Sequence, residues 1–188
     1  YTPGDDLRHV DWNVFARLDR FFIKLFREDE DLVVHLVLDT TPSMDGGARP
    51  DTPPKALYAR RLAMALGYIG LVNQNRVVVE RFGAGRPARL SPIRGRRHLD
   101  RLAAFLLDQP EENGRDAEPF EDAMRRIAYA RSGHGVMVIL SDFLFPAGIE
   151  KGLNYLHAGP TGGFDVACLQ ILSPGELDPA FELERGLR

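Results

Sequence analysis

Oxygen-bearing side chains stand where two long apolar runs of the sequence end. Asp39, Thr41 and Ser43 alternate directly after one run, and Asp142 follows the other. In an extended turn, alternating side chains project to the same side, so a carboxylate and two hydroxyls can converge on one point. Together with a second carboxylate they make an all-oxygen site, which suits Mg²⁺, Mn²⁺ or Ca²⁺ rather than zinc.

The same residue types allow two other interpretations. Asp, Thr, Pro and Ser are common turn formers, so Asp39 could simply bond the amides of its own loop in a metal-free scaffold. A strand-end Asp could also be the nucleophile of a phosphatase-like hydrolase, with Mg²⁺ bridging Asp39 and Asp142. The hydrolase is the weaker alternative, because Thr41 stands where such phosphatases carry a second carboxylate, and Lys55 falls in a helix start.

Strand and helix patterns alternate along most of the chain, and this alternation predicts how the site is positioned. Apolar runs bounded by turn residues predict strands, and apolar residues at helical spacing predict helices. The sequence therefore predicts an α/β fold with a mostly parallel central sheet and helices on both faces. Function in such sheets lies beyond the carboxyl ends of the strands, where Asp39 and Asp142 fall. The predicted strands are 21–26, 32–38, 76–82, 86–91, 136–140 and 164–172, and the predicted helices are 53–74, 98–107, 120–130 and 147–157.

Composition limits the class of protein. The chain has 188 residues, 44% hydrophobic and 27% charged, which is typical of one soluble globular domain. No apolar run reaches the length of a membrane span, so we expect membrane contact only through regions outside the chain. Tyr1 is not Met, and we expect the chain to be a piece of a longer protein. The single cysteine, Cys168, excludes an internal disulfide and fits a reducing, cytoplasmic compartment.

Other chemistry-bearing residues receive structural interpretations. The segment 76–101 carries eight Arg against one Glu and one Asp, which could meet an acidic protein, a phosphate or a nucleic acid. A solvated face is the commoner explanation of such a run, and we adopt that interpretation. Because aromatic residues are not interleaved with these arginines and the net charge is -3, we expect no nucleic-acid partner. His35 is expected to be a satisfied core or edge residue. Cys168 is expected to be inert packing on a buried strand.

The start of the chain carries a longer and more specific pattern. It reads Tyr-Thr-Pro-Gly-Asp-Asp-Leu-Arg-His-Val-Asp-Trp over residues 1–12, followed by Ala16-Arg17 and Lys24-x-Phe26. This pattern resembles the signature of the bacterial "domain of unknown function 58" family. Members of that family carry a von Willebrand factor A-like domain after the signature. The resemblance implies a lead-in over 1–31, an α/β domain over 32–173 and a tail over 174–188.

The strand-end residues also resemble the metal-ion-dependent adhesion site of von Willebrand A domains. Asp39 and Ser43 match the Asp-x-Ser-x-Ser motif, Thr41 replaces its middle Ser, and Asp142 matches the later Asp. A loop Thr of that site has no counterpart between residues 107 and 127, where Asp116 or Glu118 is the candidate replacement. We therefore expect an incomplete site with weak affinity, in the roughly millimolar range of undemanding calcium modules.

The resemblance also implies a function. It suggests a protein-binding scaffold rather than an enzyme, acting with a MoxR-type AAA ATPase in the assembly or maturation of other proteins.

Trp12 and Phe15 are expected to be buried against the domain, because large aromatic side chains gain most when they leave water.

Overall fold

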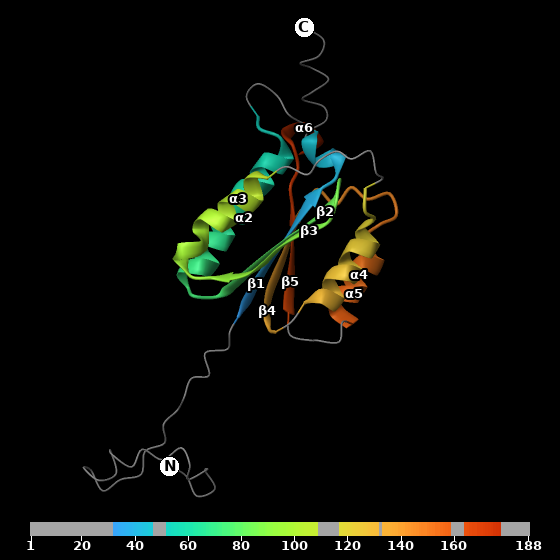
Figure 1. Ribbon diagram of the computed structural model, residues 1–188. Helices are drawn as coiled ribbons and strands as arrows, with labels where there is room; N and C mark the ends of the chain where they lie inside the picture. Colours follow the sequence, from blue (N-terminus) through green and yellow to red (C-terminus); the bar gives the residue numbers. More distant parts are fainter. Residues whose placement is uncertain (1–31, 47–51, 109–116, 132, 159–163, 178–188) are drawn as a thin grey trace, which may run out of the picture. The chain divides into compact units, whose positions relative to one another are not determined.

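Five strands form one sheet in the computed structural model, which describes residues 32–46, 52–108, 117–131, 133–158 and 164–177 (Figure 1). Their order across the sheet is β3-β2-β1-β4-β5. All neighbouring pairs are parallel except β2 and β3, which are antiparallel. The strands are β1 (Val33–Thr40), β2 (Arg76–Gly83), β3 (Ala88–Arg94), β4 (Gly135–Ser141) and β5 (Phe164–Gln170).

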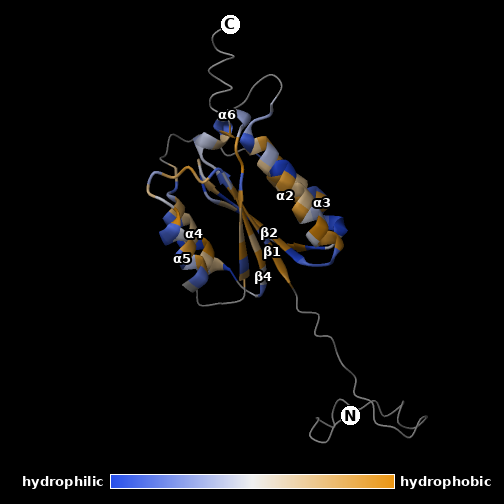
Figure 2. Ribbon diagram, turned by 180° about the vertical axis from the view of Figure 1, so that it is seen from behind, coloured by the Kyte–Doolittle hydropathy of each residue, from blue (hydrophilic) through white to orange (hydrophobic). Residues whose placement is uncertain are grey.

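Helices cover both faces of this sheet (Figure 1). One pair lies on one face, α2 (Lys55–Val72) and α3 (Leu99–Leu107), and the other pair lies on the opposite face, α4 (Phe120–Ala130) and α5 (Glu150–Ala158). Buried residues of these helices pack on the sheet, but the helices mix hydrophobic and hydrophilic residues along their length (Figure 2), and α2 leaves Tyr58 and Ile69 exposed. Three short helices lie in the connections: η2 (Pro42–Asp45), η3 (Arg96–His98) and α6 (Pro174–Leu177). No helix among the described residues is long and apolar enough to cross a membrane.

The central strand β1 divides the core into two clusters. Leu36 and Leu38 pack toward α2 and α3, whereas Val37 packs toward α4 and α5. Because successive side chains of a strand point to opposite faces, a run that is apolar throughout is what a strand buried on both sides needs. This arrangement confirms the predicted fold class, an α/β domain with a mostly parallel sheet and helices on both faces.

The predicted element bounds are correct to within a few residues, with instructive differences. Helix α2 is the longest described helix, as expected, but it begins at Lys55 after Pro54 instead of at residue 53. The edge strand predicted over 86–91 lies at 88–94. The strand predicted over 21–26 and the burial predicted for Trp12 and Phe15 lie outside the described residues.

The prediction for Cys168 is wrong, because this side chain is exposed. It lies on β5, the last strand of the sheet order, which among the described residues pairs only with β4. An apolar run predicts burial on both faces only when helices cover both faces, and most of β5 is exposed. Its apolar character therefore reflects strand formation more than burial.

The prediction for His35 is confirmed. His35 is 1% exposed, and its Nε2 lies 3.0 Å from Glu80 Oε1 on β2. The other oxygen of Glu80 accepts a 2.8 Å hydrogen bond from Arg126 of α4, and Arg89 lies 3.4 Å from Oε1. Burial acts to raise the pKa of Glu80, but the hydrogen bond from His35 and the nearby positive charges outweigh it, so the pKa lies below its ordinary value.

Candidate functional site

The ends of β1 and β4 bring the predicted site residues together. The two strands are parallel neighbours, with Leu38 opposite Leu140, so the residues that follow them share one edge of the sheet. Ser141 Oγ donates a 2.5 Å hydrogen bond to Asp39 Oδ2 and thereby joins the two strand ends directly. Asp39 is 2% exposed and Asp142 is fully buried. Asp39 and Asp142 thus both lie at the carboxyl edge of the sheet, at the ends of neighbouring strands.

The turn after β1 is organised around the Asp39 carboxylate. Its Oδ1 accepts a 2.7 Å hydrogen bond from the amide of Thr41, two residues further on. Thr41 Oγ1 and Ser43 Oγ lie 3.0 Å apart within hydrogen-bonding distance, so the alternating hydroxyls do converge. Burial raises the pKa of Asp39, although hydrogen bonds from Ser141 and Thr41 oppose that shift, and the charge of Asp142 adds to it.

Strand β2 supports this turn from the other side. Thr40 Oγ1 donates a 2.7 Å hydrogen bond to the carbonyl of Phe82, and the amide of Ala84 donates to the carbonyl of Thr40. Gly83 lies between them with a φ of +107°, and a Cβ added there would lie 2.7 Å from the Thr41 nitrogen. Only glycine accommodates both that backbone angle and that approach. The turn after β1 therefore rests on a glycine of the neighbouring strand.

The turn after β4 repeats the bonding pattern of the turn after β1. Asp142 Oδ1 accepts a 3.1 Å hydrogen bond from the amide of Leu144, again two residues further on. Ser141 Oγ accepts a 2.9 Å hydrogen bond from the amide of Phe143, whose φ of 58° is uncommon for a residue with a side chain. These two acceptors explain how the turn holds that backbone angle.

Lys55 is one of the site residues that the sequence did not predict, together with Ser141 and Glu176. Its side chain is 3% exposed, and Nζ donates to Asp142 Oδ2 at 2.8 Å and to Glu176 Oε1 at 2.6 Å. Glu176 belongs to α6, in the segment for which the sequence predicted only a tail, and its other oxygen accepts from the amide of Ser173. Burial acts to lower the pKa of Lys55, but the bonds to Asp142 and Glu176 outweigh it and raise the pKa.

A sequence signal for Lys55 did exist. The first turn of a helix carries a partial positive charge, so a lysine there is disfavoured unless an anion faces it. Lys55 is the first residue of α2, after two prolines that make the helix start visible in the sequence. The anion that faces it lies 87 residues away, and local spacing does not reveal a partner at that distance.

The oxygen set fits a hard divalent cation in part. Asp39, Thr41 and Ser43 supply a carboxylate and two hydroxyls, the ligands that Mg²⁺ and Ca²⁺ prefer. Asp142 is committed to the Lys55 ammonium, which would repel an added cation. The described residues contain no group of three or more His, Cys, Asp or Glu side chains that could hold a metal ion. Asp116 lies outside the described residues, and cation binding stays a prediction.

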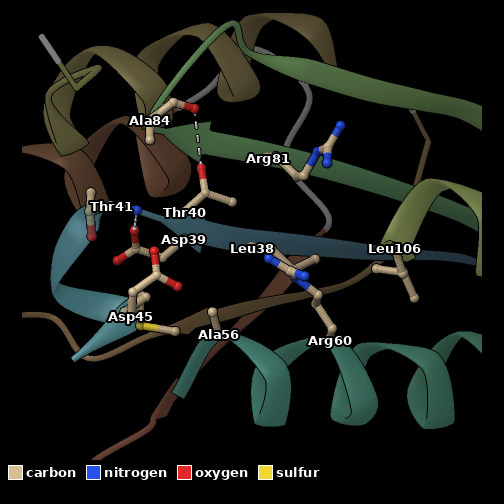
Figure 3. A pocket seen from close by; sticks show the side chains of 11 residues that line it. Leu38, Asp39, Thr40, Thr41, Asp45, Ala56, Arg60, Arg81, Ala84 and Leu106 are labelled. Carbon is tan, nitrogen blue, oxygen red and sulfur yellow. Dashed lines mark hydrogen bonds between the residues drawn. The ribbon is translucent and has the colours of Figure 1, made fainter. Parts of the chain in front are cut away.

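A cavity of about 180 Å³ opens beside the turn after β1 (Figure 3). It has an acidic end, formed by Asp39 and Asp45, and a basic end, formed by Arg60 of α2 and Arg81 of β2. Apolar side chains, among them Leu38 and Leu106, complete the lining. The interpretation of the arginines as a solvated face is wrong for Arg81, which is 8% exposed.

The fold and the strand-end site define an α/β domain whose candidate functional residues lie at the carboxyl edge of a mostly parallel sheet. Over residues 1–178 the chain matches the family described as "Protein of unknown function DUF58", and it belongs to that family. It is also similar to uncharacterized proteins of Mycobacterium tuberculosis and Mycobacterium bovis, at 27% identity over 181 residues. That similarity covers 95% of the chain and 54% of each relative, so the chain spans about half their length.

A solved structure shares the fold. The chain is similar to the conserved hypothetical protein BatB from Bacteroides thetaiotaomicron, with a TM-score of 0.55 and 19% sequence identity. The similarity covers 74% of this chain and 66% of that one. At this level of identity the likeness supports the α/β architecture and carries no information on the site.

Proposed function

We propose that this chain is a protein-binding scaffold module that docks a partner through its strand-end face, defined here as Thr41, Ser43 and Asp45 together with the adjoining cavity. One observation carries the proposal. The two strand-end carboxylates are buried and bonded within the protein, whereas the turn that they hold presents polar side chains at the surface. Loops on a rigid scaffold are where binding residues concentrate.

The same observation weighs against the hydrolase alternative. A nucleophilic carboxylate needs an open path to the substrate and a lone pair aimed at it. Asp39 is 2% exposed, and each of its oxygens accepts a hydrogen bond, from Thr41 and from Ser141. These contacts favour a structural role for Asp39, namely holding the shape of the docking turn.

A divalent cation would be held by Asp39, Thr41 and Ser43 and would supply positive charge to attract a carboxylate of the partner. The docking role rests on the exposed polar turn and the adjoining cavity, so it does not depend on the ion, and cation binding is a separate, weaker proposal. The family resemblance names the first partner to test, a MoxR-type AAA ATPase.

Photocrosslinking tests the docking face. A photoreactive amino acid replaces Asp45, which is exposed on the turn, and in a control it replaces Tyr129, which is 69% exposed on α4. We expect a covalent adduct with the purified MoxR-type ATPase from position 45 and not from position 129. Equal adducts from both positions would contradict docking through this face. An adduct from position 129 alone would move the interface to α4.

A further inference from the structure

The basic end of the cavity holds two guanidinium groups whose hydrogen-bonding capacity is not fully used among the described residues. Arg60 has no hydrogen bond or ion pair with another described residue. It lies one helical turn after Ala56, which also lines the cavity, so both residues face the same side of α2. A guanidinium without a partner beside apolar walls gains from a bound anion more than one in open water does.

Arg81 supplies a second donor that lacks a partner. Its side chain is 10% exposed, and its guanidinium lies 4.6 Å from the ring centre of Phe105. One terminal nitrogen donates to the Asp108 carbonyl and the other to Asp108 Oδ2 at 2.7 Å. Nε is buried and has no hydrogen-bond partner among the described residues. The Arg81 guanidinium lines the cavity, where a bound carboxylate would add a second anion beside it.

The carboxylates at the acidic end of the cavity do not form ion pairs with the two arginines in the described part of the chain. Both oxygens of Asp39 are occupied by Thr41 and Ser141, and Asp45 is exposed at the other end of the cavity from the guanidinium groups (Figure 3). The cavity therefore suits a ligand that has a carboxylate at one end and an N–H donor near the other. An acidic residue of a polypeptide has both, in its side chain and in its backbone amide.

Size narrows the class of ligand further. Sites for small molecules and cofactors usually enclose about 300–1,000 Å³. This cavity, at about 180 Å³, is too small for a nucleotide and suits a single side chain. We propose that Arg60 and Arg81 bind the carboxylate of one Asp or Glu side chain of a partner protein. This inference rests on the proposed docking function and specifies the chemistry of the partner.

Short peptides on the intact chain test this inference. The probe is an N-acetylated, C-amidated Gly-Glu-Gly peptide, and its control is the matching Gly-Gln-Gly peptide. Nuclear magnetic resonance follows the Nε–Hε signals of the arginines during titration. We expect saturable shifts of the Arg60 and Arg81 signals with the Glu peptide and not with the Gln peptide. Equal responses to the two peptides, or no response at tens of millimolar, would overturn the proposal.

Two variants fix the position of the site. Arg60→Gln should weaken binding of the Glu peptide by roughly tenfold, because it removes a charged fork. Arg61→Gln is the matched control, since Arg61 is its exposed neighbour on the same helix, and it should leave binding unchanged. Arg60→Gln should also leave unfolding unchanged, because Arg60 has no described partner. If Arg60→Gln binds the peptide like the wild type, the inference fails.

The two proposals fail in different ways. If a partner crosslinks from position 45 while Arg60→Gln has no effect, docking stands and acidic recognition falls. If the Glu peptide binds through Arg60 while position 45 gives no adduct, the cavity binds carboxylates but the docking proposal falls.

Discussion

A buried Asp lies at the end of both β1 and β4, but different groups compensate its charge at the two strand ends. At each end a buried Asp bonds, through Oδ1, the amide two residues further on. The other oxygen differs: on Asp39 it accepts from the neutral hydroxyl of Ser141, and on Asp142 it meets the ammonium of Lys55. Neutral donors shape a turn but leave burial to raise the pKa of Asp39. An ion pair also fastens a third element, because Lys55 and Glu176 connect α2 with α6.

Removing Lys55 should abolish the ion pair that distinguishes Asp142 from Asp39, and we expect this change to have the largest effect on stability. Lys55→Met would leave Asp142 buried without a counter-charge, and breaking a buried pair from one side costs about 3–5 kcal/mol. We expect a loss of that size in the free energy of unfolding, measured with urea. Lys151→Met, on an exposed lysine of α5, is the control and should change little. If the free energy of unfolding of Lys55→Met lies within about 1 kcal/mol of the wild type, well below the expected loss, the structural importance of this pair is contradicted.

Glu80 is a third buried carboxylate to compare with Asp39 and Asp142, and its partners are a ring nitrogen and guanidinium groups. Its pKa is lower in the folded chain than in the unfolded one, so ionised Glu80 adds stability above the ordinary carboxyl pKa. That stability is lost as the pH falls through the lowered folded value. Glu80→Gln should therefore lower the free energy of unfolding near pH 7 by about 1.5–3 kcal/mol, the usual worth of a hydrogen bond to a charged group.

The pH dependence is the decisive measurement for Glu80. The difference between wild type and Glu80→Gln should shrink as the pH falls from the ordinary carboxyl pKa of the unfolded chain to the lowered pKa of the folded chain, below which both side chains are neutral. Urea unfolding at a series of pH values follows it. A difference that stays constant down to the acid transition would mean that packing, rather than charge, explains the effect.

A cation titration gives the smallest expected effect and compares the two strand ends directly. Mg²⁺ at a concentration equal to its dissociation constant stabilises the folded protein by only about 0.4 kcal/mol. We expect a small rise in Tm for the wild type that Asp39→Ala abolishes. The rise should be larger in Lys55→Met, where the cation no longer meets the ammonium. A rise in Tm that persists in Asp39→Ala would place any ion elsewhere.

The sequence predicted what depends on strand order and periodicity. Asp39 and Asp142 meet because residues that end parallel strands share one edge of the sheet, and an apolar run reveals such strands. The partners of those carboxylates were harder to predict. Ser141 was visible next to Asp142, but its bond to Asp39 follows only from β1 and β4 being neighbours, and the pairing of Lys55 depends on where α2 begins relative to β4.

Burial was predicted well in the centre of the sheet and poorly at its edges and ends. An apolar run carries no information on whether a helix covers each face. For this reason the apolar run of β5 predicted burial for Cys168, which is exposed. Arg81 shows the opposite error. Its charge suggested solvent, but Phe105 and Asp108 enclose the guanidinium, and these contacts come from a helix that follows in the chain.

The position of β1 in the sheet has a consequence for how the protein folds. Val33 pairs with Arg76 on one side and with Gly135 on the other, so the central strand depends on segments far along the chain. Contacts between distant segments require long loops to close first, which slows folding. During synthesis β1 and the Asp39 turn emerge well before Ser141 and Asp142. The strand-end face that we propose for docking is therefore completed late, only after β4 has joined the sheet and Ser141 can bond Asp39.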